Sequence, residues 1–179
     1  MRIARKRRAR GRCAFDPADG MCHYRLVGDF EVAVGAGTLR GSAAGAVSFP
    51  HRWTPAGVSV EAAFTGAHLL HLAAAGCVLN DVYREAERLG LSVRGVRVTA
   101  SGGFDADTWR STGIVYAVEV DAQCSQQELN DLLAAVDAVA EIPKAIRAGT
   151  TVERAFPPGA DLRQRVIRGW AGSVRRRNV

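Results

Sequence analysis

A run of small and apolar residues near the middle of the chain most restricts the folds that this sequence can adopt. From Leu69 to Leu79 almost every residue is apolar or small, Thr65 is a suitable N-cap, and Gly90 is a suitable helix stop. The pattern predicts one helix of about 24 residues. A helix that is apolar on every side over its first half must be buried there, and the small residues 73–76 let another backbone approach closely. We therefore predict that this helix is the centre of the fold.

Strands are predicted on both sides of this helix. Five stretches of β-branched or alternating apolar residues carry the strand pattern, three before the helix and two after it: 24–34, 38–48, 57–64, 92–100 and 113–121. The first three predict an antiparallel meander with a turn at Gly35-Ala36-Gly37, and the last two predict a hairpin. The loop 50–55 carries His51, Arg52 and Trp53, and this loop could overhang a site.

Two further helices and a last strand complete the predicted order. Ser125 and Glu128 form a capping box ahead of an amphipathic helix. Pro143 is favoured in a first helical turn and not in a helix interior, so 142–147 predicts a short separate helix. A strand at 150–155 follows. The order βββ-α-ββ-α-α-β predicts a two-layer α+β fold with a central buried helix.

The positive charge of the chain is concentrated at its two ends. The formal net charge is +6, but residues 2–12 hold seven basic side chains, residues 163–177 hold six, and residues 13–160 carry a net charge of minus six. Blocks of like charge are typically solvated tails, although they can bind phosphates. We expect a basic, disordered leader at 1–20, with Met21 as an alternative start, one domain at 21–156, and an Arg-rich appendage at 157–179 that could form an amphipathic helix.

Other features exclude several classes of protein. No apolar run reaches the roughly 18 residues that span a bilayer, and no apolar segment follows the basic start as in a secretory signal. We therefore expect a cytoplasmic protein that does not associate with a membrane. Four cysteines lack CxxC spacing and are expected to be reduced: Cys13, Cys22, Cys77 and Cys124. His68 and His71 have the spacing of a metal pair but no third ligand, so we predict no metal and no cofactor.

The order of elements and the phrase Leu72-Ala-Ala-Ala-Gly-Cys77 resemble the OsmC/Ohr family over about residues 24–155. The resemblance implies an intertwined homodimer in which Cys77 attacks the O–O bond of a hydroperoxide and becomes a sulfenic acid. The attacking species is a thiolate, so the family places an arginine from the front hairpin beside the sulfur. Arg40 is the positional match.

The sequence departs from the family pattern at two positions. Ile142 stands where family enzymes carry the resolving cysteine, and Ala67 stands where they carry the glutamate that orients the arginine. We therefore expect no intrachain disulfide under peroxide. Glu61 or Asp81 could hold Arg40 instead. Asp81 also lies one helical turn after Cys77, where its charge would raise the pKa of the thiol.

Three functional hypotheses follow, and the sequence leaves open whether the protein is an enzyme. The first is a one-cysteine, thiol-dependent hydroperoxide reductase in oxidative-stress defence, with Cys77 and Arg40 as catalytic residues, a small hydrophobic hydroperoxide as substrate and an external thiol as reductant. The alternative is an OsmC-like binding or structural protein with an apolar pocket at the dimer interface, in which Cys77 is an inert buried thiol. A third is binding of nucleic acid through the basic tails alone, which would be independent of Cys77.

Overall fold

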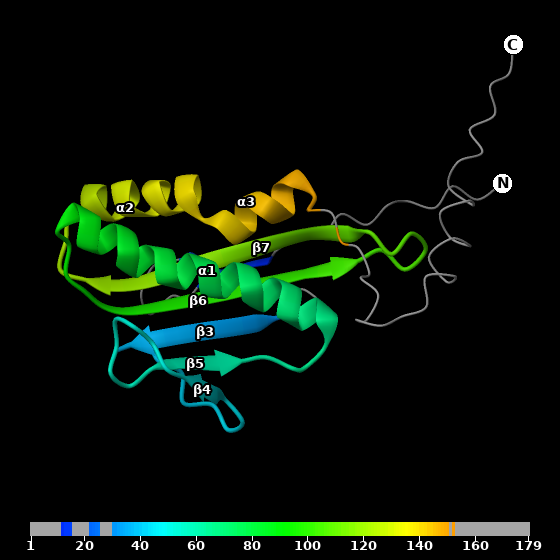
Figure 1. Ribbon diagram of the computed structural model, residues 1–179, viewed down its shortest axis with the longest axis horizontal. Helices are drawn as coiled ribbons and strands as arrows, with labels where there is room; N and C mark the ends of the chain where they lie inside the picture. Colours follow the sequence, from blue (N-terminus) through cyan, green and yellow to red (C-terminus); the bar gives the residue numbers. More distant parts are fainter. Residues whose placement is uncertain (1–11, 16–21, 26–29, 151, 153–179) are drawn as a thin grey trace, which may run out of the picture. The chain divides into compact units, whose positions relative to one another are not determined.

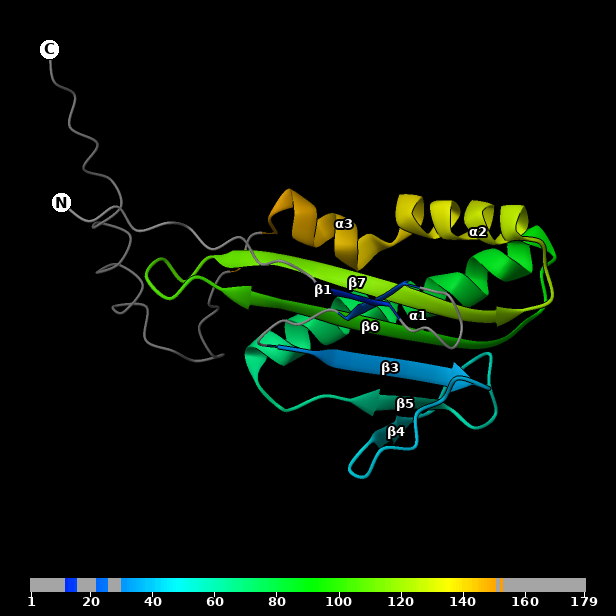
Figure 2. The same cartoon turned by 180° about the vertical axis from the view of Figure 1, so that it is seen from behind.

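The computed structural model describes residues 12–15, 22–25, 30–150 and 152. Its main sheet has the strand order β4-β5-β3-β6-β7, and every pairing is antiparallel. The strands are β3 (Val32–Gly37), β4 (Val47–Phe49), β5 (Val58–Glu61), β6 (Val93–Phe104) and β7 (Ser111–Ala122). The three helices of the described residues lie on one face of this sheet, and the view from behind shows no described helix on the other face (Figures 1 and 2). The predicted two-layer α+β class is confirmed.

The central helix α1 (Gly66–Leu89) begins and ends where the sequence predicts. The Thr65 hydroxyl accepts the backbone N–H of His68, and Gly90 adopts the left-handed conformation with φ of 69°. One stripe of α1 packs on β3 and β6, and Val78 and Val82 are fully buried in that layer. Burial on every side over the first half of the helix is wrong for a single chain, because Leu69 remains 39% exposed.

The two later helices also match their sequence signals. Helix α2 (Gln126–Val139) starts with the complete capping box of Ser125 and Glu128. Helix α3 (Glu141–Ala148) carries Pro143 in its first turn, where the missing N–H has no intrahelical partner to lose. Both helices pack against α1 (Figure 1). The elements around Cys77 therefore come from distant parts of the chain.

The predicted front meander is wrong in two respects. Residues Gly35 to Gly37 belong to β3 and do not form a turn; the chain turns immediately after Gly37, whose φ is 61°. Strand β3 pairs with β5 and β6, and the short β4 pairs only with β5. The alternating pattern of 38–48 misleads because most of that stretch is a loop, held to β5 by the bond from the Gly41 N–H to the Ser59 hydroxyl.

Two predictions concern the ends of the chain. β1 (Arg12–Phe15) and β2 (Cys22–Arg25) form a separate antiparallel pair, so the predicted disordered leader contains a strand, and the predicted strand 24–34 is divided between β2 and β3. The chain divides into two compact units, 1–148 and 149–179. The strand predicted at 150–155 lies outside the described residues except for 150 and 152, and the helix predicted within the appendage lies outside them entirely. In the described part, no helix is long and apolar enough to cross a membrane.

Candidate functional site

Cys77 lies on the flank of α1 that faces α3, and its side chain is half-buried. The thiol donates to the Asp81 carboxylate at a Sγ–Oδ2 distance of 3.5 Å and approaches Glu141 at a Sγ–Oε2 distance of 3.8 Å. Asp81 is one turn along the same helix, as its spacing predicts, whereas Glu141 is the first residue of α3. The sulfur is therefore bordered by two carboxylates.

These surroundings raise the pKa of the Cys77 thiol. Burial is the largest cause, because it penalises the charged thiolate, and the charges of Asp81 and Glu141 act in the same direction. A hydrogen bond from the backbone of Ile142 acts against them and lowers the pKa. The predicted effect of Asp81 is confirmed in direction. At neutral pH this environment favours the protonated thiol.

Arg84 joins the two carboxylates that border the sulfur. Its guanidinium lies 3.0 Å from Asp81 Oδ1 and 3.4 Å from Glu141 Oε1. Burial raises the pKa of Asp81, and the charge of Arg84 partly offsets that rise. Ligand atoms of Cys77, Asp81 and Glu141 lie within 4.8 Å of one another, which is close enough for one metal ion to contact all three. Arg84 already supplies positive charge to both carboxylates.

Arg40 lies on the other face of the sheet. In β5, Val58 and Val60 pack on the core that α1 covers, so Ser59 between them points to the opposite face. Ser48 of β4 is directly opposite Ser59 and shares that face. The Arg40 guanidinium donates to the Ser48 hydroxyl. Its position is therefore behind the sheet as seen from the helices.

The sheet consequently separates Arg40 from Cys77 within one chain. Among the described residues of the chain, Arg40 is not one of the groups that act on the pKa of Cys77. The alternative partners proposed for Arg40 are engaged elsewhere, since Glu61 makes two hydrogen bonds to Arg97 and Asp81 pairs with Arg84. Contact between Arg40 and Cys77 stays a prediction that requires a second copy of the chain.

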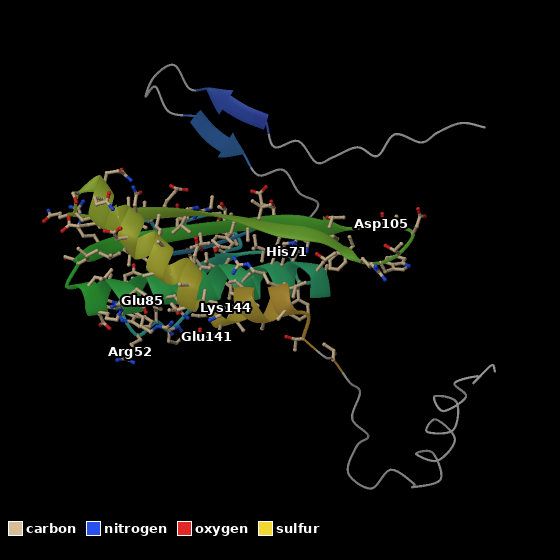
Figure 3. All side chains as sticks on the ribbon, turned by 90° about the horizontal axis from the view of Figure 1, so that it is seen from above. Arg52, His71, Glu85, Asp105, Glu141 and Lys144 are labelled. Atoms are coloured by element: carbon tan, nitrogen blue, oxygen red, sulfur yellow. The ribbon has the colours of Figure 1, made fainter. Side chains whose placement is uncertain are left out.

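The two histidines of α1 have structural surroundings. His68 Nδ1 lies 2.8 Å from the Thr65 hydroxyl, and the His68 ring contacts Phe30 edge to face. His71 is fully buried, and its Nδ1 lies 2.7 Å from the carbonyl oxygen of Ala67 (Figure 3). A Cβ at Gly102 would lie 2.5 Å from His71 Nε2, so the absence of a side chain at this position of β6 allows the His71 ring to pack there. The histidines thus anchor the start of α1 to the sheet.

A cavity of about 390 Å³ lies between α1 and the strands β3, β4 and β5. Its walls are aliphatic side chains of α1, β3 and β5 together with the loop 50–53, and Gly76 and Asn80 of α1 also line it. The loop therefore forms part of the wall of this cavity, and its overhang of a functional site stays a prediction. Cys77 is not among the residues that line the cavity.

Fold and site together define an α+β domain that carries a cysteine on its central helix. The family model of the OsmC-like proteins matches residues 59–154, which is more than half of the chain. The chain belongs to the OsmC-like protein family. It is similar, at 15% identity and a TM-score of 0.43, to the crystal structure of an OsmC-like hydroperoxide resistance protein from Jannaschia sp. CCS1, over 74% of this chain and 95% of that one. No curated protein gives a significant match.

Sequence reasoning missed Glu141 and Arg84 as neighbours of the cysteine. Arg84 follows Cys77 by two helical turns, so the helical period contained that signal. Glu141 lies 64 positions further along the chain than Cys77. The resemblance to the OsmC/Ohr family contained the signal for Glu141. It places Ile142 at the position of the resolving cysteine, so the preceding residue, Glu141, is expected near the Cys77 sulfur.

Proposed function

We propose that this OsmC-like protein is a binding protein that keeps Cys77 as a protonated thiol. The observation that carries the proposal is the pair of carboxylates, Asp81 and Glu141, at the Cys77 sulfur. A peroxidatic cysteine needs a stabilised thiolate, and two negative charges oppose it. The substitutions at Ala67 and Ile142 support the same conclusion. The cavity beside α1 supplies a place for a ligand.

The test of this proposal is the reactivity of Cys77. The purified protein is treated with cumene hydroperoxide in the presence of dimedone, and mass spectrometry measures the sulfenic acid adduct at Cys77. We expect trapping no faster than at an unstructured cysteine peptide at neutral pH. The double variant Asp81→Asn with Glu141→Gln should accelerate trapping, whereas Asp131→Asn, an exposed change on α2, should not. Rapid trapping in the parent protein would contradict the proposal.

The second candidate is the one-cysteine hydroperoxide reductase, and the Ile142 hydrogen bond to the sulfur favours it. In this reaction the Cys77 thiolate attacks one oxygen of the hydroperoxide and the O–O bond breaks. The other oxygen takes up a proton and leaves as the alcohol, and the sulfur becomes a sulfenic acid. One external thiol then forms a mixed disulfide with Cys77 with loss of water. A second external thiol attacks this disulfide, which releases the reduced cysteine and the disulfide of the two external thiols.

This second candidate function requires Arg40 to act on the Cys77 thiol. It requires a homodimer, in the reducing cytoplasm, in which Arg40 of a second copy reaches Cys77. Arg40→Ala should then raise the thiol pKa and slow sulfenic acid trapping, while Ala67→Glu should speed trapping by orienting the guanidinium. Equal trapping rates in the parent protein and both variants would exclude the arginine from the reaction.

A further inference from the structure

Three side chains of metal-ligand type, from two different helices, converge at the Cys77 sulfur. Asp81 Oδ2 lies 3.5 Å from Sγ, Glu141 Oε2 lies 3.8 Å from it, and all three donor atoms lie within 4.8 Å of one another. In a tetrahedral zinc site, a sulfur about 2.3 Å and an oxygen about 2.0 Å from the ion lie about 3.5 Å apart. The two sulfur–oxygen distances are therefore close to those between corners of such a tetrahedron.

Arg84 holds the two carboxylates by their other oxygens. Its guanidinium pairs with Asp81 Oδ1 and Glu141 Oε1, whereas Oδ2 and Oε2 are the atoms that approach the sulfur. Hydrogen bonds from an outer shell orient carboxylate ligands in this way in metal sites. Arg84 therefore directs one oxygen of each carboxylate toward the sulfur.

The charges of the cluster leave a deficit that one divalent cation would balance. With the thiol protonated and both carboxylates ionised, Asp81, Glu141 and Arg84 together carry a charge of minus one. Glu85, the third carboxylate at Arg84, is paired with Arg88 and does not change this balance. A thiolate makes the sum minus two, which a divalent ion neutralises. The negative surroundings that raise the pKa of the thiol thus attract a cation that can displace its proton.

We infer that Cys77, Asp81 and Glu141 bind one divalent cation of the zinc type. The Glu141 side chain is 67% exposed, so an ion can enter from that side, whereas the Asp81 side chain is 4% exposed. A thiolate donor favours Zn²⁺ over Mg²⁺ and Ca²⁺, which prefer sites made of oxygen alone.

Binding of the ion is an exchange of a proton for a metal. The Sγ–H bond breaks, the sulfur bonds to the metal, and the proton passes to solvent, so no group is oxidised or reduced. The inference rests on the proposed binding function, because it needs Cys77 to remain a reduced thiol, and it names the ligand of that site.

Cobalt(II) is the probe for this site, because its thiolate charge-transfer absorption reports a metal–sulfur bond directly. The reduced full chain is freed of metal with EDTA, desalted and titrated with Co²⁺, and the affinity for Zn²⁺ is measured by competition. We expect this absorption to saturate at one Co²⁺ per chain, to be abolished by Zn²⁺ and to survive excess Mg²⁺. Binding should release about one proton per ion.

Variants of the three ligands identify the site. Cys77→Ser should abolish the absorption. Glu141→Gln should weaken Zn²⁺ binding at least about tenfold, since even changes in the outer shell of a metal site cost that much. Asp81→Asn should act in the same direction; if this buried change prevents folding by circular dichroism, the exposed Glu141→Gln decides. Cys124→Ser and Asp131→Asn alter the same residue types away from the cluster, and these matched controls should bind Co²⁺ normally.

A Co²⁺ complex without thiolate absorption, absorption that survives Cys77→Ser, or unchanged Zn²⁺ affinity in Glu141→Gln would overturn the inference. Its failure can be distinguished from failure of the proposed function, because the reactivity of Cys77 is measured separately with EDTA present. If no ion binds while Cys77 resists hydroperoxide, the metal ligand is wrong and the binding function stands. If the metal-free Cys77 reacts rapidly with hydroperoxide, the binding function as proposed is wrong, whatever the Co²⁺ titration gives.

Discussion

Replacing Gly76 by alanine should stabilise the protein, and the size of the gain follows from the position of this residue. Gly76 lies near the middle of α1, where glycine costs about 1 kcal/mol relative to alanine in helix propensity. The added methyl group meets no atom within 4 Å, so no packing strain subtracts from that gain. The free energy of unfolding should therefore rise by about 1 kcal/mol, which corresponds to roughly 2–4 °C in Tm for a chain of this size.

Urea denaturation followed by far-UV circular dichroism measures this change. Gly66→Ala is the matched control, since its Cβ also meets no atom but the residue lies at the first position of the helix, where propensity matters less. A lower urea midpoint for Gly76→Ala would refute the reasoning. It would show that another group occupies the space beside Gly76 in solution, as the close approach of a second copy would require.

Three further changes test other parts of the structure. Asp81→Asn should lower the pKa of the Cys77 thiol, because it removes a negative charge that raises it; the pH dependence of iodoacetamide alkylation measures the shift, and an unchanged midpoint would contradict the geometry. Gly102→Ala should lower the free energy of unfolding by about 1–3 kcal/mol, as measured by chemical denaturation. The reason is that its Cβ would overlap the carbonyl oxygen of Gly113. The Arg97 guanidinium lowers the pKa of Glu61. The stabilisation from this pair is therefore fully present above the ordinary glutamate pKa and is lost as the pH falls through the lowered pKa. Arg97→Gln should make the acid-induced loss of stability smaller.

Local signals predict the helices of this fold well. Thr65 and Gly90 delimit α1, and the Ser125–Glu128 capping box starts α2, because each depends on groups only a few residues apart. The order of the front strands depends instead on long-range pairing. The strand β3 inserts between β5 and β6 and is buried along most of its length, which no alternation within 24–48 could reveal.

The candidate site shows the same limit. The spacing of Cys77 and Asp81 predicts their contact, because four residues make about one helical turn. The approach of Glu141 depends on how α3 docks on α1, and that docking is a property of the packed layers. The position of Arg40 follows from the unexpected turn after Gly37, which sends the chain across the far face of the sheet.

The position of Arg40 behind the sheet has a genetic consequence. If Arg40 serves Cys77 at all, the two must come from different copies, so a protomer that lacks the arginine and one that lacks the cysteine carry complementary defects. A mixed dimer of Arg40→Ala and Cys77→Ser subunits would contain one site with neither group and one site with both. Co-expression of two inactive alleles should then restore up to half of the parental hydroperoxide turnover per dimer, and a site built within one chain could not show such complementation.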